Sequence, residues 1–258
     1  MSTEPVVTWT DAGDGVLVVT LARPPANALG PPIIEGLDAA LDHAVARDVR
    51  VLVLTSAVPG FFVAGADIKH LGAVDAASFT AYGDRLRAVV EGLAAADLVS
   101  IAAIEGVALG GGLELAMAAT MRVAGDDARF GLPEVRLGLI PGAGGTQRLP
   151  RLVGRGRAID IMATARQVPA SEAAAIGLVD RHVAAGTARD VALELAGTLG
   201  ALSRPALAAV VRTVDAAFDR PLPEGLGYEV AQIQELFEHG EAAEGIAAFL
   251  EKRPPKFA

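Results

Sequence analysis

The chain has 258 residues, 52% of them hydrophobic, and its formal net charge at pH 7 is −9. An acidic chain without a block of basic residues does not suit nucleic acid, whose phosphates require clustered Lys and Arg. Cysteine is absent, which excludes disulfides, thiolate metal sites and cysteine nucleophiles. No run of 18 apolar residues suggests a membrane span, and Met1–Pro5 does not resemble a signal peptide, so we expect a cytoplasmic protein.

Strand-like and helical runs alternate over the first half of the chain. Short β-branched, apolar runs predict buried strands, and apolar residues recurring at three- and four-residue steps predict helices. This alternation is typical of an α/β core. The predicted strands are Val16–Leu21, Val51–Thr55 and Ile101–Ile104, and the predicted helices are Pro31–Asp48 and Asp75–Asp97.

The pattern changes after about residue 187, where strand-like runs stop. Helices are expected near 187–200, 204–217, 223–239 and 241–250, with Pro205 near the start of the second and Pro221 and Pro223 near the start of the third. An all-helical tail of this kind is either an assembly or lid module, or simply more of the core.

Several common catalytic motifs are missing. No Gly-Lys pair forms a Walker A loop, and no glycine cluster fits the dinucleotide-binding pattern G-x-G-x-x-G. No serine lies in G-x-S-x-G, and none of the four histidines forms H-E-x-x-H. Metal catalysis and serine–histidine chemistry therefore lack their usual residues.

Two glycine-rich turns each follow a predicted strand. The first is the FVAGADIK segment, 62–69, and the second is Gly106–Gly112, which runs directly into an apolar helix, Leu113–Ala119. Unshielded N–H groups at a helix start attract anions, so two facing turns could donate to one carbonyl oxygen as an oxyanion hole. The alternative is that the glycines only allow a helix and a strand to pack closely.

Two glutamates follow these turns in the sequence. Glu114 begins an otherwise apolar helix, where a lone buried carboxylate is costly. Glu134 follows Pro133, which favours an extended approach to it. Taken singly, Glu114 could be a helix-start residue favoured by the dipole, and Glu134 a surface turn residue.

A third glycine segment, Ile140–Arg148, has too little polarity for a surface loop of this length. We expect it to pack against the same pocket before a helix, Thr146–Val153. A helix-start turn capped by Thr146 is an equally good interpretation, and the two are compatible.

Together these residues resemble the crotonase (enoyl-CoA hydratase/isomerase) superfamily, over nearly the whole chain. The resemblance implies an α/β fold, a crotonase-like spiral of ββα units with a C-terminal all-helical trimerisation module. The expected division is a core over 1–196 with a CoA-thioester site and a helical oligomerisation region over 197–258. The segments that carry the resemblance are ARPPANAL (22–29), FFVAGADIKHLG (61–72), IAAIEGVALGGGLELAM (101–117), RFGLPEVRLGLIPGAGGTQRLPRLVG (129–154), AAAIGLVDRHV (173–183) and FLEKR (249–253).

The resemblance also assigns roles. It implies that the N–H groups of Ala66 and Gly111 form the oxyanion hole, that Glu114 acts mainly as base toward water, and that Glu134 donates a proton to C2. Two neighbouring carboxyls cannot both ionise cheaply, so one should stay protonated near neutral pH. The remaining CoA or substrate contacts that it implies are Ala64, Gly65, Asp67, Ile68, Gly110, Pro133, Gly142, Phe249 and Lys252.

The implied activity is reversible hydration of 2-trans-enoyl-CoA to 3-hydroxyacyl-CoA, as in the β-oxidation of fatty acids, by a homotrimer or homohexamer. It needs no metal and no cofactor besides the CoA of the substrate. The alternatives are a Δ3,Δ2-enoyl-CoA isomerase, a thioester hydrolase or decarboxylase, and a non-catalytic acyl-CoA-binding protein.

The chain departs from the common family pattern at several places. Pro25 replaces a basic residue available to the CoA phosphates, Leu98-Val99-Ser100 replaces Lys-Pro-Val, Glu105 replaces Asn, and Leu132 replaces a Gln frequent in short-chain hydratases. None is one of the two glutamates. Residues 70–82 follow the first turn and are expected to line the acyl pocket.

Overall fold

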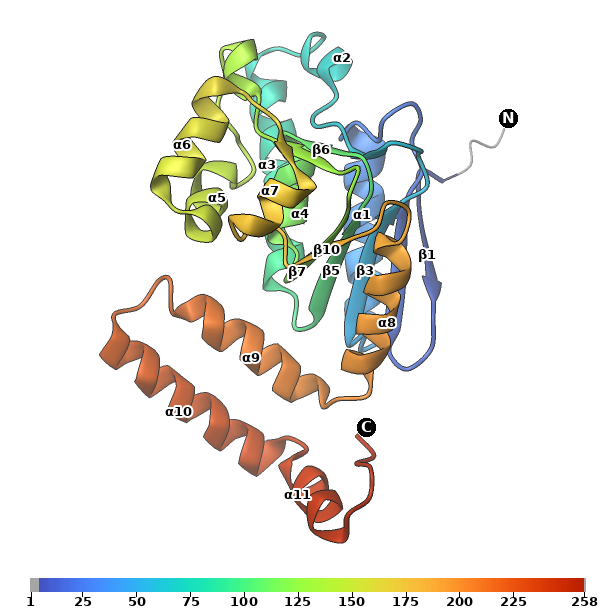
Figure 1. Ribbon diagram of the computed structural model, residues 1–258, viewed down its shortest axis with the longest axis vertical. Coiled ribbons are helices and arrows are strands. Elements are labelled where there is room, and N and C mark those ends of the chain that lie inside the picture. Colours follow the sequence, from blue (N-terminus) through green and yellow to red (C-terminus); the bar gives the residue numbers. More distant parts are fainter. Residues whose placement is uncertain (1–4, 258) are drawn as a thin grey trace.

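The computed structural model describes residues 5–257. Met1–Glu4, which make up most of the segment considered for a signal peptide, lie outside the described residues, as does Ala258. Within the described part, the chain forms an α/β core and a C-terminal group of helices that projects from it (Figure 1).

The main sheet has six strands in the order β1-β2-β3-β5-β7-β10, parallel except for the antiparallel pair β1–β2. Its central strands are runs of Val, Leu, Ile and Ala, as expected for parallel strands covered on both faces. The strands are β1 (Val7–Asp11), β2 (Val16–Leu21), β3 (Val51–Ser56), β5 (Val99–Ile104), β7 (Met121–Gly125) and β10 (Arg181–Val183).

Alternate side chains of these strands enter two different hydrophobic cores, because successive residues of a strand point to opposite faces. Leu52 and Leu54 join the core formed with α1 (Pro31–Ala46), α3 (Ala76–Ala95) and α4 (Gly111–Ala118). Val51 and Val53 join the core formed with α8 (Ala188–Gly200) on the other face.

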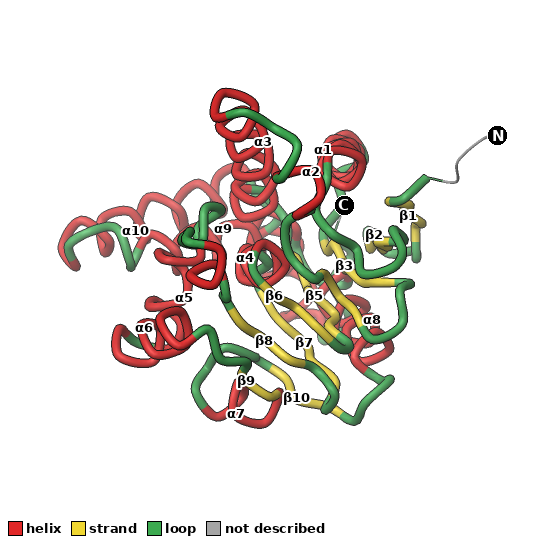
Figure 2. Tube along the Cα trace, turned by 90° about the horizontal axis from the view of Figure 1, so that it is seen from above, coloured by secondary structure: helices red, strands yellow, loops and turns green. Residues whose placement is uncertain are grey.

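A second sheet of four strands has the order β4-β6-β8-β9, with β4, β6 and β8 parallel. Its strands β6, β8 and β9 are labelled in Figure 2. Three successive units, β3-β4, β5-β6 and β7-β8, each give one strand to each sheet, and helices follow each unit. This is the spiral of ββα units that the resemblance implies. The strands are β4 (Phe61–Val63), β6 (Val107–Leu109), β8 (Arg129–Gly131) and β9 (Val168–Pro169).

The carboxyl ends of β4, β6 and β8 are followed within three residues by Ala66, Gly111 and Glu134 respectively. The order of the sheet therefore brings together positions that are far apart in the sequence. The elements after these ends are α2 (Ile68–Leu71) and α3, then α4, and then the 3-10 turn η1 (Glu134–Leu137) with α5 (Gly145–Val153), α6 (Arg155–Thr164) and, beyond β9, α7 (Ala170–Ala175).

The C-terminal helices are α9 (Arg204–Ala216), α10 (Leu222–His239) and α11 (Ala242–Glu251), and they extend away from the core (Figure 1). They carry large apolar side chains in solvent, including Ile233, 66% exposed, and Phe237, 69% exposed. The domain boundary expected at 196/197 falls inside α8, which packs on the main sheet up to Gly200.

Each strand and helix that the sequence predicts is present, with ends within two residues of the prediction. The elements that sequence analysis did not predict are mostly short, such as the three-residue strands β4, β6 and β8. Three residues are too few to show a hydrophobic period.

Candidate active site

A cavity of about 600 Å³ opens where the ends of β4, β6 and β8 meet α3. Most of the predicted site residues lie on its wall. These are Ala64, Gly65, Ala66, Ile68, Gly110, Gly111, Glu114, Pro133, Glu134 and Gly142. From the segment 70–82, which was expected to line an acyl pocket, Leu71, Phe79 and Tyr82 also lie on it.

The first glycine turn is held in place by a β-bridge between Leu29 and Ala66. Leu29 donates its N–H to the Gly65 carbonyl at 2.8 Å and accepts the Asp67 N–H at 3.4 Å. In a parallel bridge the residue between these two groups points its own N–H the other way. The Ala66 N–H is therefore directed away from Leu29, on the side of the cavity.

The second glycine turn lies against the first. Gly111 is the first residue of α4, so its N–H has no acceptor within the helix and lies at the positive end of the dipole. A Cβ built on Gly111 would be 3.9 Å from the Ala66 nitrogen, so the two N–H groups are neighbours. A Cβ on Gly112 would lie 2.2 Å from the Val63 oxygen, so close packing also requires a glycine. Close packing of a helix and a strand therefore accounts for Gly112, while the oxyanion hole at Gly111 stays a prediction.

Glu114 is 2% exposed and lies in the first turn of α4. Its Oε1 accepts the N–H groups of Ala143 at 2.7 Å and Gly145 at 2.8 Å. Burial raises the pKa of the Glu114 carboxyl, and these two backbone bonds oppose the increase. The third glycine segment thus packs against the pocket as expected, while the N-cap of α5 is Gly144 rather than Thr146.

Glu134 begins η1, and its Oε1 lies beside the start of α4, 3.0 Å from where a Cβ on Gly110 would stand. Its Oε2 is buried without a hydrogen-bond partner among the described residues. Burial, with a further contribution from the Glu114 charge, raises the pKa of Glu134 to about 7. The expected extended approach is wrong, because Pro133 has φ −88° and ψ 17° and starts a 3-10 turn. Proline fixes φ only, so ψ was free to turn the chain.

Asp67, Phe249 and Lys252 do not lie on the cavity wall of this chain. The Asp67 carboxylate caps α2 through the N–H groups of Lys69 and His70, and it pairs with Arg23 at 2.7 Å. Phe249 lies in α11, 84% exposed, and Lys252 is the left-handed C-cap of that helix. Both belong to the projecting C-terminal helices.

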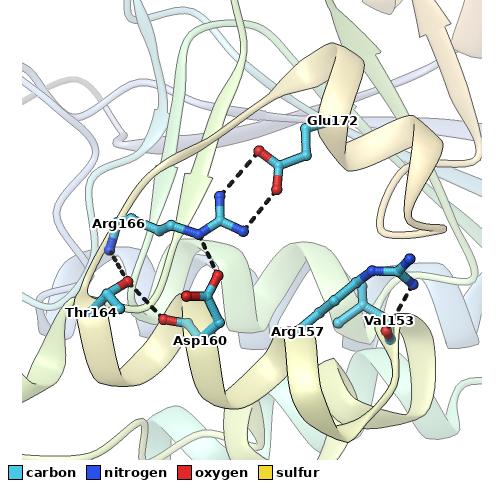
Figure 3. Close-up of polar contacts among 6 residues, drawn as sticks. All are labelled: Val153, Arg157, Asp160, Thr164, Arg166 and Glu172. Atoms are coloured by element: carbon cyan, nitrogen blue, oxygen red, sulfur yellow. Dashed lines mark hydrogen bonds and ion pairs between the residues drawn. The ribbon is translucent and has the colours of Figure 1, made fainter.

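Sequence analysis missed the far wall of the cavity, which includes Arg136, Ala165 and Arg166. The Arg136 guanidinium donates to the Ala165 carbonyl at 3.1 Å, which joins η1 to this wall. Arg166 is held by both Glu172 oxygens and by Asp160 (Figure 3). These carboxylates fix the cation, and no sequence motif signals the arrangement.

Within residues 5–257, no three His, Asp or Glu side chains are grouped as metal ligands. Over the same residues, every helix is too short or too polar to cross a bilayer.

The model of one protein family, enoyl-CoA hydratase/isomerase, matches residues 11–258. This chain belongs to that family, and the family predicted from the motifs is confirmed. The chain is 39% identical to probable enoyl-CoA hydratase 2, mitochondrial, of Arabidopsis thaliana, over 94% of this chain and 81% of that protein. It is also 39% identical to probable enoyl-CoA hydratase echA8 of Mycobacterium leprae, over 96% of each. Methylglutaconyl-CoA hydratase, mitochondrial, of Homo sapiens is 36% identical, over 90% of this chain and 70% of that protein.

Solved structures of similar proteins superpose closely. Pseudomonas aeruginosa DspI has a TM-score of 0.94 at 37% identity, covering 99% of this chain and 97% of that chain. An enoyl-CoA hydratase from Bacillus anthracis has a TM-score of 0.94 at 33% identity, covering 98% of each. The predicted α/β crotonase-like fold is confirmed.

Proposed function

We propose that this protein is an enoyl-CoA hydratase, which adds water across the double bond of a 2-trans-enoyl-CoA. The single observation that carries the proposal is that one cavity is lined by two carboxyls, the buried Glu114 and the half-buried Glu134, together with Ala66 and Gly111, whose N–H groups are neighbours. The names of the relatives support the same activity.

The thioester oxygen accepts hydrogen bonds from the Ala66 and Gly111 N–H groups. The negative charge that develops there as the enolate forms is stabilised more than the charge of the ground state, which is what lowers the barrier. The thioester thus becomes an electron acceptor, and C3 becomes open to attack by water.

Glu114 takes a proton from water while the water oxygen bonds to C3, and the double-bond electrons move toward the thioester oxygen. Glu134 then gives its proton to C2. Exchange with solvent after product release restores both carboxyls. The two backbone donors on Glu114 favour its charged form, and the unpartnered Oε2 of Glu134 favours its protonated form. These contacts support the roles of base and acid respectively.

CoA is the only group besides water that the reaction needs. We assign its thioester end to Ala64, Gly65, Ile68 and Gly110, with Pro133 and Gly142 on the facing wall. Asp67 acts by fixing α2 and the turn before it. Phe249 and Lys252 would reach a CoA adenine only from a neighbouring copy, as the resemblance implies.

The test is turnover of crotonyl-CoA, followed by loss of the enoyl thioester absorbance and by identification of 3-hydroxybutyryl-CoA. Glu114→Gln and Glu134→Gln should each lower the rate roughly 10²–10⁴-fold. A parallel assay with 3-enoyl-CoA measures isomerisation, and release of free CoA measures hydrolysis. Inactivity on short, long and branched 2-enoyl-CoA esters, with acyl-CoA binding retained, would contradict hydration.

We also propose that the helical region 197–258 joins copies of the chain into a trimer or a hexamer. The exposed apolar side chains of α10, such as Ile233 and Phe237, support this. Ile233→Glu should lower the mass found by sedimentation, whereas Val45→Glu, at a 64% exposed position on α1, should not. An unchanged mass for Ile233→Glu would contradict the assignment. A cytoplasmic location and a role in fatty-acid β-oxidation remain predictions, which cell fractionation and growth on fatty acids can test.

A further inference from the structure

Leu29 contacts both halves of the oxyanion hole. Its backbone is bonded to Gly65 and Asp67, on either side of Ala66. Its side chain is fully buried against the second turn, since a Cβ built on Gly111 would lie 2.9 Å from Leu29 Cδ1. The Leu29 N–H holds the Gly65 carbonyl, which shares a peptide plane with the Ala66 N–H, so the position of the Leu29 backbone sets where that N–H points. The Leu29 side chain limits how closely Gly111 approaches it. The Leu29 carbonyl belongs to the next peptide, Leu29–Gly30, which shares the Leu29 Cα and is bonded to the Asp67 N–H.

One side chain holds that peptide from the cavity side. Tyr82, on α3, lies on the cavity wall and is 8% exposed. Its hydroxyl donates to the Leu29 carbonyl at 2.6 Å, while the Asp67 N–H reaches the same oxygen only at 3.4 Å. The Tyr82 hydroxyl makes the shorter bond, so it is the stronger restraint on this carbonyl.

We propose that Tyr82 is a positioning residue for the oxyanion hole, fixing the Leu29 carbonyl and through it the direction of the Ala66 N–H. The inference rests on the proposed function, because the N–H matters only where an oxygen of the substrate accepts from it. The sequence placed Tyr82 on the apolar face of a helix and at the end of the segment expected to line the acyl pocket, and gave it no part in the oxyanion hole.

A second restraint keeps the segment folded without Tyr82. The Arg23 guanidinium donates to the Ala28 carbonyl at 2.6 Å and pairs with Asp67 at 2.7 Å. Removal of the Tyr82 hydroxyl therefore leaves the two segments joined and changes mainly the orientation of one peptide. Phenylalanine also keeps the ring contact with His70, whose centroid lies 5.3 Å from that of Tyr82.

The phenol is suited to donate at all working pH values. Burial raises the pKa of Tyr82 to about 12, so its hydroxyl keeps its proton. The Tyr82 hydroxyl donates its hydrogen bond to the Leu29 carbonyl, so Tyr82 acts through the backbone rather than on the substrate.

The test compares Tyr82→Phe with Tyr228→Phe, which changes the other of the two tyrosines of the chain. Complete loss of one oxyanion-hole donor costs about 10²–10³-fold in kcat, so misalignment should cost less, about tenfold to hundredfold. KM should change little, and Tyr228→Phe should keep the wild-type kcat. An unchanged kcat for Tyr82→Phe would overturn the proposal.

A direct readout separates positioning from general destabilisation. The carbonyl stretch of a bound, isotope-labelled saturated acyl-CoA thioester reports the hydrogen bonds to its oxygen. In Tyr82→Phe the frequency of this carbonyl stretch should move toward that of the free thioester. A lower kcat with an unchanged stretch would overturn the proposal. This measurement needs no turnover, so it still decides the role of Tyr82 if the enzyme proves inactive on 2-enoyl-CoA.

A second variant covers the case in which Tyr82→Phe does not fold. In a Tyr228→Phe background, biosynthetic fluorotyrosine replaces Tyr82 alone and makes its hydroxyl a stronger donor of nearly unchanged size. The carbonyl stretching frequency of the bound thioester should then move further from that of the free thioester, which is the opposite direction to the shift in Tyr82→Phe. No movement would overturn the proposal.

Discussion

The two walls of the cavity carry the same side chain in opposite surroundings. All eight residues of α4, with Glu114 among them, are buried. None of the four residues of η1, with Glu134 among them, is buried, and its Leu137 is exposed. Glu114 receives two backbone N–H groups, whereas Glu134 Oε2 receives none.

This difference is the basis on which the proposed mechanism gives opposite tasks to two identical groups. The two backbone donors favour the charged form of Glu114, whereas at Glu134 burial outweighs a single bond to its own backbone and favours the protonated form. In the proposed mechanism the surroundings, rather than the residue type, divide the roles of base and acid.

The largest expected effect comes from separating the two roles. Both Glu114→Gln and Glu134→Gln should lower hydration roughly 10²–10⁴-fold. Exchange of the C2 hydrogen of a saturated acyl-CoA with solvent deuterium, measured by NMR, should survive in Glu114→Gln and be lost in Glu134→Gln. Equal loss of exchange in both variants would show that the walls do not divide the roles.

The pH dependence should follow Glu134, whose pKa lies at about 7. Hydration needs it protonated, so kcat/KM for hydration should fall as pH rises through about 7, by about tenfold per pH unit. Dehydration of 3-hydroxyacyl-CoA releases no net proton and needs the same singly protonated carboxyl pair, so its kcat/KM should fall over the same pH range. Both dependences should disappear in Glu134→Gln, and their persistence there would assign the titration to another group.

The smallest effect concerns the packing around Glu114. A Cβ on Gly145 would lie 2.7 Å from Pro141 Cβ and 3.0 Å from Glu114 Oε1, whereas a Cβ on Gly142 would meet nothing within 4 Å. Gly145→Ala should therefore lower the free energy of unfolding by about 1–3 kcal/mol. Gly142→Ala should change it by less than about 0.5 kcal/mol. Denaturant titration measures both changes in the free energy of unfolding. Equal changes would mean that the residues around Gly145 shift to accept the added methyl group.

The same contrast explains what the sequence could predict. A glutamate in an apolar helix indicated a buried carboxyl at Glu114, because the local pattern contains the information. From the sequence Glu134 fits a surface turn residue, and its partial burial arises where η1 lies beside Gly110 at the start of α4, which no local pattern records. Tyr82 fits the apolar face of a helix, where a core position and a cavity wall look alike. The strands β4, β6 and β8 were likewise too short to predict from the sequence, although their order in the sheet determines which residues lie together in the cavity.

That order has a geometric consequence. Neighbouring strands of a sheet lie about 4.8 Å apart. Ala66, Gly111 and Glu134 each follow one of three adjacent parallel strands. The spacing of these strands thus sets the separation of the three backbone positions, which side-chain substitutions hardly alter. If the proposed mechanism holds, we expect acyl-chain preference to change through residues elsewhere on the cavity wall while the backbones of Ala66, Gly111 and Glu134 keep their separation.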